Sequence, residues 1–131
     1  MAGQKGCFGP IAMVPVNIAG ILAGVANPEE VDVIITRVTV DVTTESTGAA
    51  NLQVGIAANA TTADDGLITA TAIDGAPTIV DSVDVTQNVR KWGSGQFLTF
   101  HGSADTTGLV ANAYVEYIRV YDSALDSCRR R

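Results

Sequence analysis

The chain has 131 residues, of which 47% are hydrophobic, 17% charged and 5% aromatic, and its formal net charge at pH 7 is −6. This length suits one domain, and a chain of this size buries roughly two-thirds of its unfolded surface without a metal or disulfide. The acidic balance disfavours contact with phosphate groups, so we expect no nucleic-acid partner.

Residues 1–27 are predicted to be an extended N-terminal arm. The first ten residues are rich in glycine, and Phe8 is their one large side chain and the obvious anchor. Residues 11–18 could form a first strand, which Pro15 would confine to a sheet edge or a bulge. The apolar run 11–26 resembles a targeting segment, but Pro15 and Asn17 interrupt it, and it is too short to cross a bilayer as a helix. We therefore interpret it as structural and expect no membrane partner.

Residues 31–59 are predicted to form a long β-hairpin around which the rest of the chain is organised. Both arms are rich in Val, Ile and Thr, which suit a half-buried pleated surface. The six residues between the arms are small turn-formers, including Gly48, which can adopt a positive φ.

The apolar positions of the first arm change parity. Val38, Val40 and Val42 alternate with polar residues, whereas Val33 and Ile35 precede them with the opposite parity. This predicts a bulge near residues 34–35, or a segment that is buried on both faces.

Further strands are expected at residues 67–73, 78–85, 96–102 and 109–121, separated by short polar turns. The total of about seven or eight strands without a convincing helix predicts an all-β fold. We expect an antiparallel, jelly-roll-like β-sandwich over residues 28–122, followed by a basic tail over residues 123–131.

The two cysteines lie near opposite ends of the chain. A disulfide between Cys7 and Cys128 is possible, but two cysteines without framework spacing do not predict one, and reduced thiols are the default. Three of the eight basic residues follow Cys128 directly, namely Arg129, Arg130 and Arg131. Such a tail either contacts an acidic patch on a partner or stays solvated.

Catalytic residues are not predicted. The sole histidine, His101, has Ser103 and Asp105 nearby in sequence, but these residue types are ordinary at a strand end and turn. No nucleophile elbow or oxyanion-hole motif accompanies them. We therefore expect neither an enzyme nor a cofactor.

Metal ligands are not predicted either. Asp64 and Asp65, with Glu45 or Asp105 from similar turns, could offer oxygen ligands to Ca²⁺, but their spacing does not match an EF-hand loop. No Cys/His cluster has the spacing of a zinc site.

The most distinctive local cluster is Arg90, Lys91 and Trp92. Tryptophan and arginine often dominate the binding energy of protein interfaces, so the cluster is a candidate interface. The alternative is a Trp92 buried in the core between two solvated neighbours.

Two stretches resemble a known group of proteins. They are RVTVDVTTESTGAANLQVGIAANATTADDGLI, from Arg37, and KWGSGQFLTFHGSADTTGLVANAYVEYIRV, which ends at Val120. In the second, the shared positions are Trp92, Ser94, Gly95, Phe97, Gly108, Leu109, Val110, Ala113 and Tyr114. The chain is similar there to small β-rich proteins of tailed bacteriophages and prophages, which are typically encoded beside the major capsid protein.

The resemblance implies a structural role in a virion. We expect a decoration or cement protein, or a head-fibre protein, that binds the major capsid protein on the outside of a phage head as a homo-oligomer, with a trimer favoured. The arm over residues 1–26 lies outside the match and is expected to contact a partner. The expected interface residues are Phe8, Arg90, Lys91, Trp92, Arg129, Arg130 and Arg131.

A carbohydrate- or receptor-binding β-sandwich remains the alternative function. It would use Trp92, Tyr114 or Tyr121 as stacking platforms for a sugar. The low aromatic content of the chain argues against it.

Overall fold

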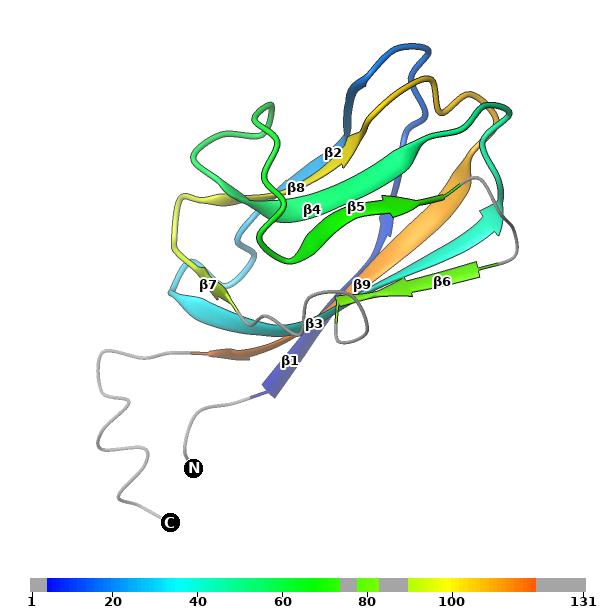
Figure 1. Ribbon diagram of the computed structural model, residues 1–131. Helices are drawn as coiled ribbons and strands as arrows, with labels where there is room; N and C mark the ends of the chain where they lie inside the picture. Colours follow the sequence, from blue (N-terminus) through cyan, green and yellow to red (C-terminus); the bar gives the residue numbers. More distant parts are fainter. Residues whose placement is uncertain (1–4, 74–77, 83–89, 120–131) are drawn as a thin grey trace, which may run out of the picture.

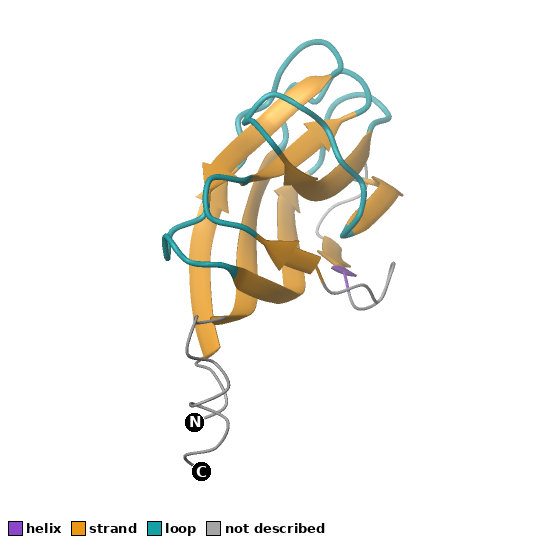
Figure 2. Cartoon of the chain, turned by 90° about the vertical axis from the view of Figure 1, so that its left-hand side faces the viewer, coloured by secondary structure: helices purple, strands orange, loops and turns teal. Residues whose placement is uncertain are grey.

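The computed structural model describes residues 5–73, 78–82 and 90–119, which form two antiparallel β-sheets packed face to face (Figure 1). Strands account for most of this part of the chain (Figure 2). Their bounds are β1 Lys5–Ala12, β2 Gly20–Ala26, β3 Val33–Thr44, β4 Asn51–Ala57, β5 Ile68–Ala72, β6 Thr78–Asp81, β7 Arg90–Trp92, β8 Phe97–Gly102 and β9 Val110–Arg119. The predicted all-β sandwich is confirmed, and these ranges contain no helix that is long and apolar enough to cross a membrane.

The strand order is that of a jelly roll. The first sheet has the order β1-β9-β3-β6, with the short β7 also paired to β3, and the second sheet has the order β2-β8-β4-β5. The chain passes from one sheet to the other between β1 and β2, between β3 and β4, and between β8 and β9. The second sheet lies above the first in Figure 1.

The predicted hairpin at residues 31–59 is wrong. β3 pairs with β9, β6 and β7 in the first sheet, whereas β4 pairs with β8 and β5 in the second. Residues 45–50 therefore cross between the sheets instead of joining two neighbouring strands. Both arms still turn their apolar faces inward, because Val40 and Leu52 lie in the same core with no exposed surface.

The predicted bulge in β3 is confirmed. The β3–β9 register shifts between Ile35 and Arg37, so the apolar positions change parity at this point. Ile35 before the shift and Val38 after it are both fully buried. On its other side β3 pairs with β7 before the bulge and with β6 after it, and the amide of Val38 donates to Ser82 Oγ between them (2.8 Å).

The core between the sheets is one continuous cluster of apolar side chains. Its largest fully buried members include Trp92 and Ile35 of the first sheet and Phe100 and Leu22 of the second. Burying one large apolar side chain contributes about 1.5–3 kcal/mol, so this shared layer is the main force that holds the sheets together.

The segment predicted as a free arm forms part of the sandwich instead. β1 pairs with β9 at the edge of the first sheet, and β2 pairs with β8 at the edge of the second. Phe8 is partly buried and packs against the core. The sandwich therefore begins at Lys5 and not near residue 28.

Candidate functional site

The most distinctive surface of the molecule is formed by residues 6–26, which we call the uncharged flank. It comprises β1 from Gly6 onward, the connection 13–19, and β2. The chain has no Asp, Glu, Lys, Arg or His from Gly6 to Pro28, although its net charge is −6. This part of the surface therefore differs in character from the rest of an acidic protein.

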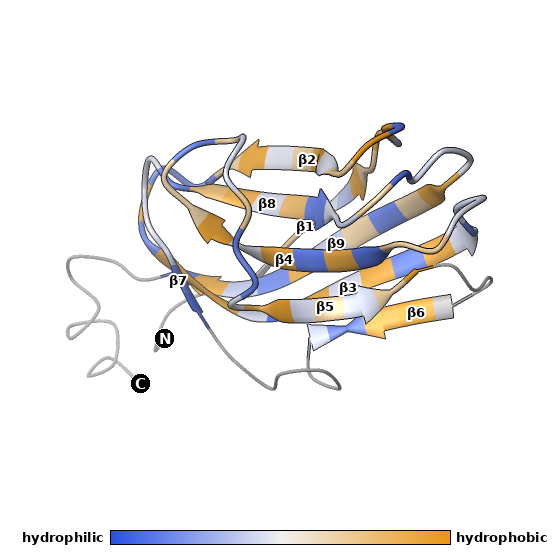
Figure 3. Ribbon diagram, turned by 45° about the horizontal axis from the view of Figure 1, so that its top comes forward, coloured by the Kyte–Doolittle hydropathy of each residue, from blue (hydrophilic) through white to orange (hydrophobic). Residues whose placement is uncertain are grey.

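Two large aliphatic side chains stand out from the flank. Val14 is 65% exposed and Ile18 is 70% exposed, the largest exposures among the big hydrophobic residues of the described chain. Figure 3 colours β2 in orange and pale shades, without a strongly hydrophilic position. Exposed apolar side chains that gather in one place mark surfaces that other molecules cover.

The flank also contains two open sheet edges. Within the described residues, β1 and β2 each have one strand partner, β9 and β8 respectively. The two edges lie one above the other, and the amide of Val14 donates to the carbonyl of Leu22 across the gap (2.9 Å). Unpaired backbone groups at such edges are sites where another strand can add.

The connection 13–19 is held in place by a buried threonine. The amide of Val16 donates to Thr106 Oγ1 (3.0 Å), and the amide of Thr106 donates to the carbonyl of Val16 (2.8 Å). Thr106 has no exposed surface. Val14 and Ile18 are thus presented from a fixed loop.

The apolar surface continues onto the outer face of the first sheet. Ala12 is paired with Asn112, and the pairing continues with a hydrogen bond from the amide of Met13 to the carbonyl of Ala111 (3.1 Å). In this register Val14 comes opposite Val110, which is 49% exposed.

Elsewhere the described basic side chains are mostly neutralised by acidic ones. Arg37 donates from Nε to Asp81 Oδ2 (2.9 Å), and Lys91 Nζ lies 3.1 Å from Asp32 Oδ2. Arg119 forms the third ion pair, with Glu29. Because acidic residues outnumber basic ones in the whole chain, fourteen to eight, the surface outside the flank is dominated by negative charge.

The end of the sandwich where β1 begins carries a compact polar network. Arg119 Nε donates to Glu29 Oε1 (2.7 Å), and the Tyr117 hydroxyl donates to Glu29 Oε2. The hydrogen bonds from Arg119 and then Tyr117 lower the pKa of Glu29. Burial, together with the bond to Glu29, raises the pKa of Tyr117 to about 12.

The cluster predicted from Arg90, Lys91 and Trp92 is not an exposed patch. Trp92 has no exposed surface, and its Nε1 donates to the carbonyl of Gln96 (3.0 Å). Lys91 is held by Asp32, and the guanidinium of Arg90 fills the space beside Gly66. The structure thus places Trp92 in the core, so it cannot stack on a sugar at the surface.

Several other predicted residues lie outside the described part of the chain. These are Tyr121, Cys128, Arg129, Arg130 and Arg131. Cys7 is exposed on β1, and Tyr114 is 43% exposed on β9.

The residues considered for a hydrolytic triad do not form a hydrogen-bonded relay. His101 Nδ1 is buried without a partner among the described residues. Ser103 Oγ accepts from the amide of Asn51 (2.8 Å). Asp105 accepts from the hydroxyl and the amide of Thr107, which together lower its pKa.

The acidic turns considered for Ca²⁺ lie at opposite ends of the sandwich. Glu45 precedes β4 and Asp64 follows it, and β4 is a seven-residue strand that rises about 3.3 Å per residue. Over the described ranges, no group of three or more His, Cys, Asp or Glu side chains could hold a metal ion.

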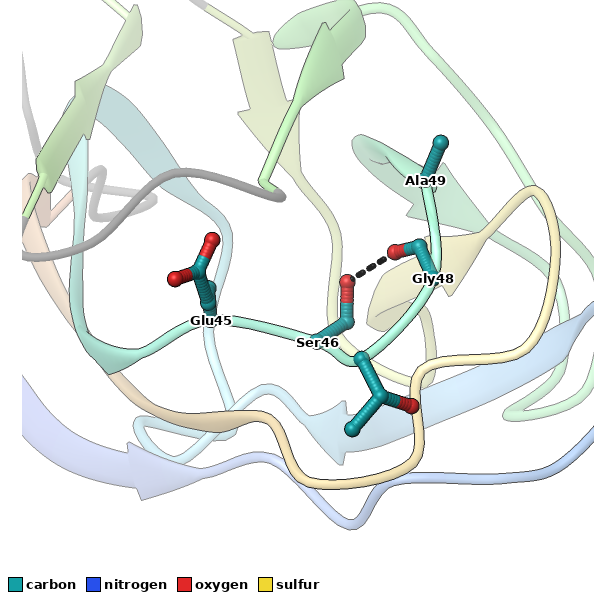
Figure 4. Close-up of a pocket in the computed structure, with 5 residues that line it drawn as sticks. Glu45, Ser46, Gly48 and Ala49 are labelled. Carbon is teal, nitrogen blue, oxygen red and sulfur yellow. Dashed lines mark hydrogen bonds between the residues drawn. The ribbon is translucent and has the colours of Figure 1, made fainter.

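An open hollow of about 460 Å³ lies beside the crossing segment, lined by Glu45, Ser46, Thr47, Gly48 and Ala49. Ser46 Oγ donates to the carbonyl of Gly48 (2.6 Å), which ties the turn to itself (Figure 4). Among the described residues of this lining, Glu45 is the one with a charged group, and none has an aromatic side chain that could stack on a sugar.

The lack of charged residues from Gly6 to Pro28 is visible in the sequence, but the exposure of this segment at the surface is not. The apolar character of residues 11–26 is apparent from the sequence, but the exposure of Val14 and Ile18 is not. Comparisons with known proteins add nothing to this description, because no family model, no curated protein and no solved structure matches the chain.

Proposed function

We propose that this protein is a non-enzymatic structural subunit of a tailed-phage particle. It decorates the outside of the head, binds the major capsid protein and acts as a homo-oligomer. The observation that carries the proposal is the uncharged flank, which presents Val14 and Ile18 beside two open sheet edges. Such a surface is stabilised when protein covers it, at about 25 cal/mol per Å² of apolar area removed from water.

Two further observations support this role. The sequence resembles phage proteins that are typically encoded beside the capsid gene. The jelly-roll order of the strands is used by many virus shells, although the same fold also serves lectins and enzymes, so the fold itself carries little weight.

The test is binding to the shell. Purified protein is mixed with shells assembled from the major capsid protein encoded beside it, and the mixture is sedimented. We expect the protein to sediment with the shells up to a fixed ratio of copies, and the decorated shells to resist heating better than bare shells. Protein that stays in the supernatant at every ratio contradicts the proposal.

The carbohydrate-binding alternative is less well supported. It needs exposed aromatic platforms, but Trp92 is in the core. Tyr114 is the exposed candidate within the described residues. Binding on a glycan array that is kept in Tyr114→Phe, which retains the ring, and lost in Tyr114→Ala, combined with no binding to shells, would favour that function instead.

A further inference from the structure

We infer that copies of this chain contact one another through the uncharged flank. This inference rests on the proposed function only in assuming that protein covers the flank. It commits to one occupant, a second copy of the same chain.

Charge is the first argument for a second copy. Each copy carries a net charge of −6, so two copies repel each other over most orientations. A two-fold symmetric contact brings the same surface of both copies together, so acidic residues in it would face acidic residues. The flank is free of charged side chains from Gly6 to Ala26 and is therefore the surface on which self-contact is least opposed. A partner selected by opposite charge would instead use the acidic remainder.

The second argument is the geometry of the flank. β2 contains no proline, and within the described residues no strand pairs with its outer edge, where the carbonyl of Leu22 accepts from the amide of Val14, so the rest of this edge is available to another strand. β1 is less suitable for strand addition, because Pro10 lacks an amide hydrogen and a bulge lies between Phe8 and Ile11. Val14 and Ile18 project beside both edges and supply the apolar area of the contact.

The third argument is that the flank is already ordered. The reciprocal hydrogen bonds between Val16 and Thr106 fix the connection that carries Val14 and Ile18. A fixed loop loses little conformational freedom on association, so more of the burial energy is available for binding.

The experiment compares two isoleucines. Ile18 in the flank is 70% exposed, and Ile79 on β6, at the opposite edge of the first sheet, is 59% exposed. Ile18→Lys and Ile79→Lys are each measured by light scattering over a range of protein concentrations. Lysine makes the net charge less negative, so weaker association cannot result from greater repulsion between acidic bodies.

We expect the unaltered protein and Ile79→Lys to form the same oligomer, with a mass that is a multiple of 13.5 kDa. Ile18→Lys should have the monomer mass at the same concentrations, with a dissociation constant raised at least about tenfold, which equals the cost of about 1.4 kcal/mol for a buried charge at the contact. Circular dichroism of both variants should match that of the unaltered protein, which checks that they are folded.

A second measurement uses the exposed thiol of Cys7, which lies on β1 within the flank. In a Cys128→Ser background, its reaction rate with a thiol reagent should fall as protein concentration rises, and Ile18→Lys should remove this protection. An unaltered protein that stays monomeric, or equal effects of Ile18→Lys and Ile79→Lys, would overturn the inference. Neither readout involves shells, so failure of shell binding alone contradicts the proposed function and not the self-contact.

Discussion

Tyr117 illustrates how single residues close the end of the sandwich where β1 begins and β9 ends. Tyr117 is 4% exposed, and its ring packs against Gly6. A side chain added at Gly6 would overlap this ring. The hydroxyl of Tyr117 donates to Glu29, which also binds Arg119. One aromatic residue thereby links the strand pair β1–β9 to the turn that precedes β3.

The alkaline stability of the protein should depend on Tyr117. Its pKa is raised from 10 to about 12, so the folded state holds this proton more tightly than the unfolded state does. The resulting stabilisation is complete below pH 10 and is lost as the pH rises from 10 to about 12. Tyr117→Phe should therefore flatten the fall in the free energy of unfolding over this range, as measured by urea denaturation at successive pH values.

Tyr114→Phe is the matched control, because Tyr114 lies on the exposed face of the same strand. It should leave the alkaline profile unchanged. If Tyr117→Phe and the unaltered protein lose stability equally between pH 10 and 12, burial and the bond to Glu29 do not raise the pKa of Tyr117 as described.

For single residues, the sequence predicts which positions alternate between the two faces of a strand, but not which face is turned to the core and which to solvent. Arg90, Lys91 and Trp92 alternate as partly buried, exposed and buried, as a strand requires. The composition of the cluster is equally typical of an interface and of a core tryptophan with polar neighbours. Only the pairing of β7 with β3, which places Trp92 over the core, distinguishes the two.

The position of the loop 58–66 depends on two glycines of the second sheet. Gly24, Thr99 and Gly55 form a row across β2, β8 and β4. A side chain at Gly24 would meet the carbonyl of Ala60 at 2.5 Å, and one at Gly55 would overlap the carboxylate of Asp64. The two glycines thus let the loop fold back onto the outer face of the second sheet.

Gly55→Ala should detach this loop. The added methyl group would also lie 2.7 Å from the carbonyl carbon of Asp64, so the backbone of the loop must move. We expect a loss of about 1–3 kcal/mol in the free energy of unfolding, together with faster proteolysis within residues 58–66. Urea denaturation and mass spectrometry of the fragments measure the two effects.

Gly20→Ala provides the comparison, because the nearest atom to a side chain there is Val16 Cγ2 at 3.7 Å, an ordinary contact. It should change neither stability nor proteolysis appreciably. Equal proteolysis of Gly55→Ala and Gly20→Ala would show that the loop is not held on the glycine row.

The connection between β3 and β4 marks the limit of prediction for elements. The alternation of Val38, Val40 and Val42 predicts a strand with one buried face, and the parity change before it predicts the bulge. The six residues 45–50 have the chemistry of a turn in either case. Whether β4 returns beside β3 or crosses to the other sheet is decided by long-range pairing with β8, which no local pattern reports.

For the whole molecule, the shared core predicts that both sheets unfold together. Leu98 of β8 has no exposed surface and belongs to the same cluster as Trp92 of β7, in the other sheet. Leu98→Ala should reduce the free energy of unfolding by about 2–5 kcal/mol. The fluorescence of the single tryptophan and the far-ultraviolet circular dichroism should shift to the same lower midpoint.

A dichroism change at lower denaturant than the fluorescence change would mean that the second sheet unfolds alone. The sequence predicts an all-β sandwich from its strand count and spacing, and this fold class is confirmed. It does not predict that residues 5–26 complete both sheets, because their partners β9 and β8 lie far away in the sequence and no local pattern reports such pairing.

This separation has a consequence during synthesis of the chain. Lys5 pairs with Ile118 and Ala26 with Phe97, so β1 and β2 leave the ribosome before their partners β9 and β8 and must wait for them. At about 5–20 residues per second, β1 and β2 remain without partners for several seconds. From Gly6 onward they carry no charged side chain, so Pro10 and the glycines are the features that discourage premature pairing between nascent chains. The lack of charge from which we infer the self-contact would therefore also expose this region to association with other nascent chains during synthesis.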